Sequence, residues 1–148
     1  MQLGGIALNR CGRLSVLVCV WLCACGVSND PDEVAEAFCQ RYFVEMNQAR
    51  ALELAEGLAA EKLRQEIDLL KGAARAFEGG EGEFHRLKPY TDYTLRKRSE
   101  KDEAHVLFIY TIKIEARQDT TTLHRELVLN TVRENGRWRV NNFDLAAR

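Results

Sequence analysis

The stretch Ala104-His-Val-Leu-Phe-Ile-Tyr-Thr-Ile-Lys-Ile-Glu-Ala116 decides the fold class. Large apolar side chains recur in it at every second position, at Val106, Phe108, Tyr110, Ile112 and Ile114. A period of two predicts a β-strand with one face in a core. Leu107 and Ile109 stand between them, so the middle of this strand is predicted to be covered on both faces.

Strand patterns also flank this stretch, at residues 90–98 and 121–133. After the second of these, Asn135-Gly136 is a pair favoured in a type I′ hairpin turn, because both central residues of that turn need a positive φ. In the strand that follows, the apolar residues Val140 and Phe143 differ in parity, which predicts a β-bulge. We therefore expect three to four long antiparallel strands joined by hairpins.

The segment before the strands has a helical period. Asp30 is expected to cap a first helix and Pro31 to begin it. Apolar residues at a spacing of four then predict one buried stripe along this helix, with members Val34, Phe38, Tyr42 and Met46. Cys39 and Phe43 widen this stripe.

Two more helices are expected before the first strand. A short one ends near Gly57, and a longer one begins around Ala59. The predicted core stripe of the longer helix has spacings of three and four, with members Leu63, Ile67, Leu70, Ala74 and Phe77. The glycines of residues 79–82 end it.

Helices followed by an antiparallel meander predict one α+β domain over residues 31–148, with the N-terminal helices packed on a curved sheet. Three segments, at residues 30–38, 43–52 and 134–140, resemble the nuclear transport factor 2-like superfamily, also called SnoaL-like or cystatin-like. The resemblance spans residues 31–145 and implies a cone-shaped domain. This superfamily includes isomerases, dehydratases, transport factors and envelope lipoproteins, so the resemblance does not choose an activity.

The N-terminus reads as a signal peptide. Residues 1–24 contain no acidic residue, and Arg10 and Arg13 precede an apolar run at residues 14–22. The next residues, Leu22-Cys-Ala-Cys25-Gly26, resemble the lipobox of bacterial lipoproteins. We therefore expect a signal peptide over residues 1–24, lipid attachment at Cys25, and a short tether over residues 25–30 that holds the domain at a membrane.

Two alternatives to lipidation remain open. The segment Ala24-Cys25-Gly26 also fits an ordinary signal peptidase site, which would release a soluble protein beginning at Val27. The apolar segment could also stay uncleaved as a short anchor. For the lipidated form, Gly26 in place of Asp favours the outer over the inner membrane, so the expected location is the cell envelope, facing the periplasm.

Charge and cysteine content limit the partners. Without Arg10 and Arg13, 19 basic residues face 22 acidic ones, a net charge of −3 that disfavours nucleic acid as a partner. Of the five cysteines, only Cys39 remains after processing and acylation, so no disulfide framework is expected. Cys39 is interpreted as a small buried apolar residue on a helix.

No catalytic or metal-binding motif stands out. The three histidines, His85, His105 and His124, fall on separate elements, so neither a metal nor another cofactor is expected. His105 and His124 are expected to face solvent or the rim of the cone.

An isomerase- or dehydratase-like enzyme would need a carboxylate such as Asp144 to converge with a tyrosine inside the cone. The candidates for lining such a pocket are Tyr42, Tyr110 and Trp138.

The sequence thus favours a non-enzymatic, membrane-tethered envelope module that binds a small apolar ligand or an envelope protein. The alternatives are an enzyme that uses the pocket of the cone and a soluble, secreted homodimeric module.

Overall fold

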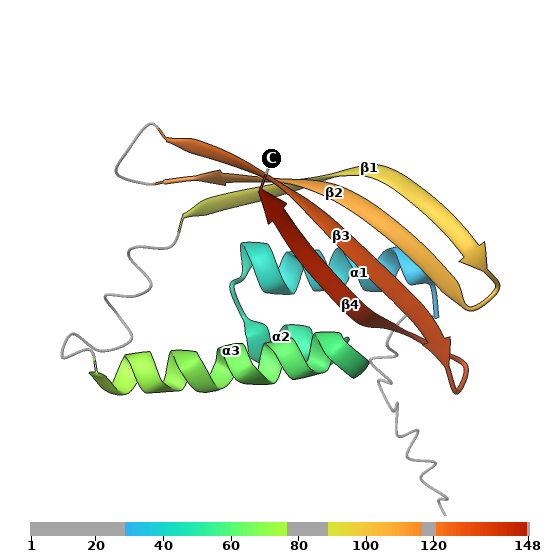
Figure 1. Ribbon diagram of the computed structural model, residues 1–148, viewed down its shortest axis with the longest axis horizontal. Coiled ribbons are helices and arrows are strands. Elements are labelled where there is room, and N and C mark those ends of the chain that lie inside the picture. Colours follow the sequence, from blue (N-terminus) through green and yellow to red (C-terminus); the bar gives the residue numbers. More distant parts are fainter. Residues whose placement is uncertain (1–28, 77–88, 117–120, 148) are drawn as a thin grey trace, which may run out of the picture.

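The structure, a computed structural model, describes residues 29–76, 89–116 and 121–147. The helical elements come first (Figure 1): α1 (Pro31–Cys39), the π-helical turn η1 (Gln40–Val44), α2 (Gln48–Leu52) and α3 (Gly57–Ala76). Four strands follow: β1 (Tyr90–Asp102), β2 (His105–Glu115), β3 (Thr122–Glu134) and β4 (Arg137–Ala147). They form an open antiparallel sheet in the order β1-β2-β3-β4. The predicted α+β class, with helices and an antiparallel sheet, is confirmed.

Strand β1 is longer than predicted. It continues past Arg98 to Asp102, because a bulge at Arg96 restores its pairing with β2. Arg98 contacts the first turn of α1, where its Nε lies 2.9 Å from the Asp32 carboxylate. This ion pair joins the far part of β1 to the start of α1.

Helix α1 begins as predicted. Asp30 Oδ1 accepts a 2.8 Å hydrogen bond from the Asp32 backbone N–H, and Pro31 is the first helical residue. The buried face of α1 includes Val34, Phe38 and Cys39. Phe38 lies between α1 and β4, with its ring 5.2 Å from that of Phe143.

The predicted stripe on this helix is wrong at its end. The π turn of η1 repeats at five residues, so Phe43 is buried after Phe38, whereas Tyr42 is only half-buried. Met46, predicted to be in the core, is 38% exposed. Met46 has a φ of 52° and turns the chain, and Asn47 then caps α2 by accepting a hydrogen bond from the Arg50 N–H.

All helices of the described ranges lie on one face of the sheet (Figure 1). On that face the alternate residues of β2 from Val106 to Ile112 are buried, together with Leu127 and Leu129 of β3. On the opposite face Leu107 and Ile109 are half-buried. The predicted cover on both faces of β2 is therefore only partial on the face away from the helices.

Helix α3 packs through its first half. Leu63 is fully buried and Ile67 is half-buried, but Leu70, predicted to be in the core, is 42% exposed. The cause is the course of α3, which runs beside β4 and then beyond the sheet (Figure 1). Phe77 and the side chain of Ala74, the last members of that predicted stripe, lie outside the described residues.

Lys62 links α3 to β4, the edge strand of the sheet, by hydrogen bonds. Its Nζ donates to Asn142 Oδ1 at 2.9 Å, to the Phe143 carbonyl at 2.7 Å and to Asp144 Oδ1 at 2.6 Å. The same ammonium group lies 5.4 Å from the centroid of the Phe143 ring. The hydrogen bond and charge of Lys62 lower the pKa of the Asp144 carboxyl.

We expect Lys62→Met to lower the free energy of unfolding by about 1–2 kcal/mol at neutral pH, because three acceptors on β4 lose their donor. Since the pKa of Asp144 is lowered in the folded state, the part due to this ion pair is present above the unfolded pKa and is lost as the pH falls through the folded one. Urea denaturation at neutral pH and at about pH 3 measures both parts. Lys71→Met is the control, because Lys71 only reaches Asp68, at 3.9 Å. An equal loss in both variants would contradict the prediction.

Candidate functional site

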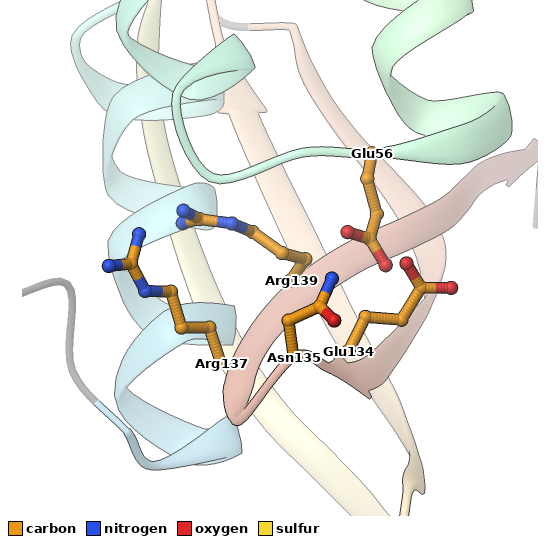
Figure 2. A pocket seen from close by; sticks show the side chains of 5 residues that line it. All are labelled: Glu56, Glu134, Asn135, Arg137 and Arg139. Carbon is orange, nitrogen blue, oxygen red and sulfur yellow. The ribbon is translucent and has the colours of Figure 1, made fainter.

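A pocket of about 360 Å³ lies beside the β3–β4 hairpin (Figure 2). Four charged side chains and one amide line it: Glu56, Glu134, Asn135, Arg137 and Arg139. Its lining is therefore polar, unlike the apolar interior expected from the sequence. This pocket is the candidate functional site.

The hairpin turn brings three of these residues together. Asn135 and Gly136 have φ values of 50° and 76°, as the predicted type I′ turn requires. The register then pairs Glu134 with Arg137. Arg137 and Arg139 project from the same side of β4 because side chains alternate along a strand, while Trp138 between them is buried.

A β-bulge follows in β4, as predicted. The register shifts between the pairs Asn130–Asn142 and Thr131–Val140, so Asn141 is the extra residue. Val140 and Phe143 are thereby both buried, although their parity differs.

Glu56 reaches the pocket from a loop that is bonded to the edge of β4. The Val140 N–H donates to the Leu54 carbonyl at 2.9 Å, and the Glu56 N–H donates to the Val140 carbonyl at 2.9 Å. Ala55 thus forms a parallel bridge with Val140. The Glu56 carbonyl accepts a hydrogen bond from the Ala60 N–H at the start of α3, so the backbone of Glu56 is held on both sides.

The charges of the pocket are separated by sign. Figure 2 shows the guanidinium groups of Arg137 and Arg139 on one side of Asn135 and the carboxylates of Glu56 and Glu134 on the other. None of the ion pairs between described residues joins either arginine to either glutamate. Two positive and two negative side chains therefore line one pocket without forming ion pairs with each other.

Two polar atoms of the residues that line this pocket are shielded from solvent and have no hydrogen-bond partner. They are Glu56 Oε1 and Arg139 Nη1. Leaving such a group unpaired costs about 1–3 kcal/mol, and more for a charged group, so native proteins keep few of them. One atom is an acceptor that lacks a donor, and the other is a donor that lacks an acceptor.

Burial raises the pKa of Glu56, and the nearby Glu134 carboxylate raises it further, whereas Arg139 acts in the opposite direction. The ionised form of Glu56 is thus destabilised in the folded protein. A cationic group that entered the pocket beside Glu56 would offset this destabilisation by its charge.

We expect Glu56→Gln to raise the free energy of unfolding at neutral pH, by at most about 1 kcal/mol. Because the folded-state pKa of Glu56 is raised, its ionised form costs stability above that pKa, and the cost disappears as the pH falls through it. The difference from the wild type should therefore vanish in acid, as followed by thermal unfolding across pH. Glu61→Gln, at an exposed residue of α3, is the control. Destabilisation by Glu56→Gln would refute this reading of the pocket.

The three residues expected to line a pocket in the cone are packing residues, and none of them lines the pocket at the hairpin. Tyr110 is 1% exposed and Trp138 is 6% exposed. The ring of Tyr42 packs on those of Phe38 and Phe143. The Tyr42 hydroxyl donates to the Glu66 carboxylate at 2.9 Å.

The acid–base candidates lie apart. Asp144 is 62% exposed and hydrogen-bonded to Lys62, whereas Tyr110 is buried in the core. His105 is exposed and lies 2.7 Å from Asp102 at the β1–β2 turn, and His124 is exposed, as predicted for both. Cys39 is fully buried, as predicted, and its burial raises the pKa of its thiol.

Other predictions fall on residues that the structure does not describe. Cys25 and the signal peptide lie within residues 1–28, and His85 lies within residues 77–88. Over the described ranges, no group of three or more His, Cys, Asp or Glu side chains is arranged to hold a metal ion. Of the helices in these ranges, none combines the length and the apolar character needed to cross a membrane.

The sequence analysis did not single out the residues of the pocket. The segment 134–139 contained a signal, because charged residues flank an Asn-Gly turn and then alternate with Trp138. Glu56 gave no such signal. Its position depends on the backbone bridge between Ala55 and Val140, which lie 85 residues apart in the sequence.

No protein-family model matches the chain, and no curated protein matches it. The function must therefore be argued from the residues of the chain itself.

Proposed function

We propose that this protein is a lipid-anchored module of the bacterial cell envelope that binds a ligand in the pocket of the β3–β4 hairpin. The observation that carries the binding role is the pair of shielded, unpaired atoms, Glu56 Oε1 and Arg139 Nη1. A ligand that bonded both would remove a cost that the protein otherwise bears alone.

The tether is supported by the sequence before the domain. The lipobox-like residues Leu22 to Gly26 precede Asp30, the cap of α1, by only a few residues. An acyl chain contributes about 0.8 kcal/mol per buried CH₂, so two or three chains hold a small domain firmly at a membrane. The domain would then face the periplasm. Gly26, in place of Asp after the lipidated cysteine, favours attachment to the outer membrane.

A binding role fits the chemistry of the pocket better than catalysis does. Its lining offers carboxylates, guanidinium groups and an amide, which can hold a charged ligand through several hydrogen bonds. The groups that an isomerase-like reaction would use, Asp144 and Tyr110, have other partners or lie in the core.

We also propose that the domain has the cone-shaped fold of the nuclear transport factor 2-like superfamily. Three features support this assignment: the helices precede the strands, the sheet is a curved antiparallel meander, and α1 lies on its concave face (Figure 1). The bulge in β4 adds to this curvature.

Native mass spectrometry of the full-length protein, expressed in a bacterium and extracted with detergent, tests the proposed function. We expect the mass of residues 25–148 plus acyl chains, and in Cys25→Ser the loss of that mass and of membrane attachment. A ligand that survives extraction adds its own mass, and a homodimer doubles the total.

Two results would overturn parts of the proposal. An unlipidated chain that begins at Val27 would make this a secreted soluble protein. A pocket that stays empty with every probe tested, in an extracted protein that carries no bound mass, would remove the binding role.

A further inference from the structure

We infer that the hairpin pocket binds a small zwitterion, a molecule that carries an ammonium group and a carboxylate, such as a free amino acid or a short peptide. The ammonium group would lie against Glu56 and Glu134, and the carboxylate against Arg137 and Arg139. This inference rests on the binding role proposed above but not on the lipid anchor.

The two unpaired atoms define what the ligand must offer. Glu56 Oε1 accepts only, so it needs an N–H or O–H donor. Arg139 Nη1 donates only, so it needs an acceptor. One molecule that carries a donor at one end and an acceptor at the other meets both needs.

The charges make that donor cationic and that acceptor anionic. Glu134 lies close enough to Glu56 to raise its pKa, so this side of the pocket has excess negative potential. Arg137 and Arg139 give the other side excess positive potential (Figure 2). Charge-assisted hydrogen bonds to ammonium and carboxylate groups are about twice as strong as neutral ones.

The balance of charge argues against a simple ion. The charges of the two glutamates and two arginines sum to zero. A simple anion would be attracted by the arginines but repelled by the glutamates, and a simple cation would be attracted by the glutamates but repelled by the arginines. A neutral zwitterion oriented along the pocket gains on both sides. The volume of about 360 Å³ is at the small end of ligand pockets, which favours a small molecule.

The test is calorimetric titration of the full-length protein in detergent with matched probes. The zwitterions are γ-aminobutyrate and glycylglycine, which differ in the distance between their charges. Butyrate and butylamine are the two halves of γ-aminobutyrate, each with a single charge. We expect at least one zwitterion to bind about 10-fold or more tightly than either half, because a second charge-assisted bond is added.

Substitutions in the pocket separate its two sides. Glu56→Gln should weaken zwitterion binding about 10-fold and leave butyrate unaffected, and Arg139→Gln should weaken it about 10-fold and leave butylamine unaffected. Glu61→Gln and Arg64→Gln, at exposed residues of α3, are the matched controls. Circular dichroism verifies that each variant is folded, and Glu56→Gln is expected to be more stable than the wild type at neutral pH.

Three results would overturn the inference. In the first, no zwitterion binds at about 10 mM, a concentration that would nearly saturate a site with a Kd of about 1 mM. In the second, butyrate or butylamine binds as tightly as the zwitterions. In the third, binding is unchanged in both pocket variants. The proposed binding role survives the first two of these results if the extracted protein carries a bound mass that Glu56→Gln or Arg139→Gln removes.

Discussion

Replacement of Phe38 by alanine is expected to lower the free energy of unfolding by about 3–5 kcal/mol. Phe38 is fully buried and joins the helical layer to the sheet. Its ring stacks on that of Tyr42 at 5.7 Å and packs on that of Phe143 at 5.2 Å. The substitution removes these contacts and leaves a cavity that the surrounding side chains cannot fill without moving α1 toward β4.

Urea and thermal unfolding measure this effect. A loss of about 3–5 kcal/mol is a large fraction of the stability of a small domain, so the melting temperature should fall by well over 10 °C, at roughly 4–8 °C per kcal/mol. Phe38→Leu is the matched control, because it keeps most of the volume and should cost clearly less. Similar losses in both variants would mean that the aromatic contacts with Tyr42 and Phe143 matter more than the filled volume.

Replacement of Gly57 by valine is expected to cost about 2–3 kcal/mol. Gly57 has a φ of 52°, a conformation that a β-branched residue rarely adopts. A Cβ at this position would also lie 3.0 Å from Asn141 Nδ2, on the bulge of β4. The strain falls on the loop that holds Glu56, so binding in the pocket should weaken together with the stability.

Gly72 offers the control within the same helix. It lies in the interior of α3, and a Cβ there would meet nothing within 4 Å. Gly72→Ala should therefore stabilise the protein by about 0.5–1 kcal/mol, through helix propensity and reduced freedom of the unfolded chain. Thermal unfolding of both variants should give shifts of opposite sign. A destabilised Gly72→Ala, or an unchanged Gly57→Val, would contradict the reading of these two glycines.

The sheet could be predicted from the sequence because its signals are local. The alternation of residues 104–116, the Asn-Gly turn and the parity change before Phe143 each depend on neighbouring residues. The structure has a strand, a type I′ turn and a bulge at these places. The Asp30 cap of α1 was predictable for the same reason.

The predictions of burial that are wrong concern residues whose burial depends on tertiary contacts. A spacing of four does not reveal the π turn of η1, which rotates Met46 out of the core. The apolar stripe of α3 does not show where the helix passes beyond the sheet, so Leu70 was placed in the core. In both cases the apolar pattern identifies one face of a helix, but it does not show how far along the helix the packing against other elements continues.

The candidate site was missed for a different reason. Its residues are polar, and polar residues near a turn are usually solvated. What distinguishes Glu56 and Arg139 is that one atom of each is shielded and unpaired. That property arises only when the loop of residues 54–56 is bonded to Val140.

The same loop affects how copies of the protein can associate. A strand at the border of a sheet offers free N–H and C=O groups, which can template the addition of a strand from another chain and so lead to aggregates. On β4 the backbone groups of Val140 are taken by Leu54 and Glu56, and the carbonyl of Phe143 is taken by Lys62. Over this stretch the border is closed to an incoming strand, so the loop that shapes the pocket also protects the protein from edge-to-edge polymerisation along β4.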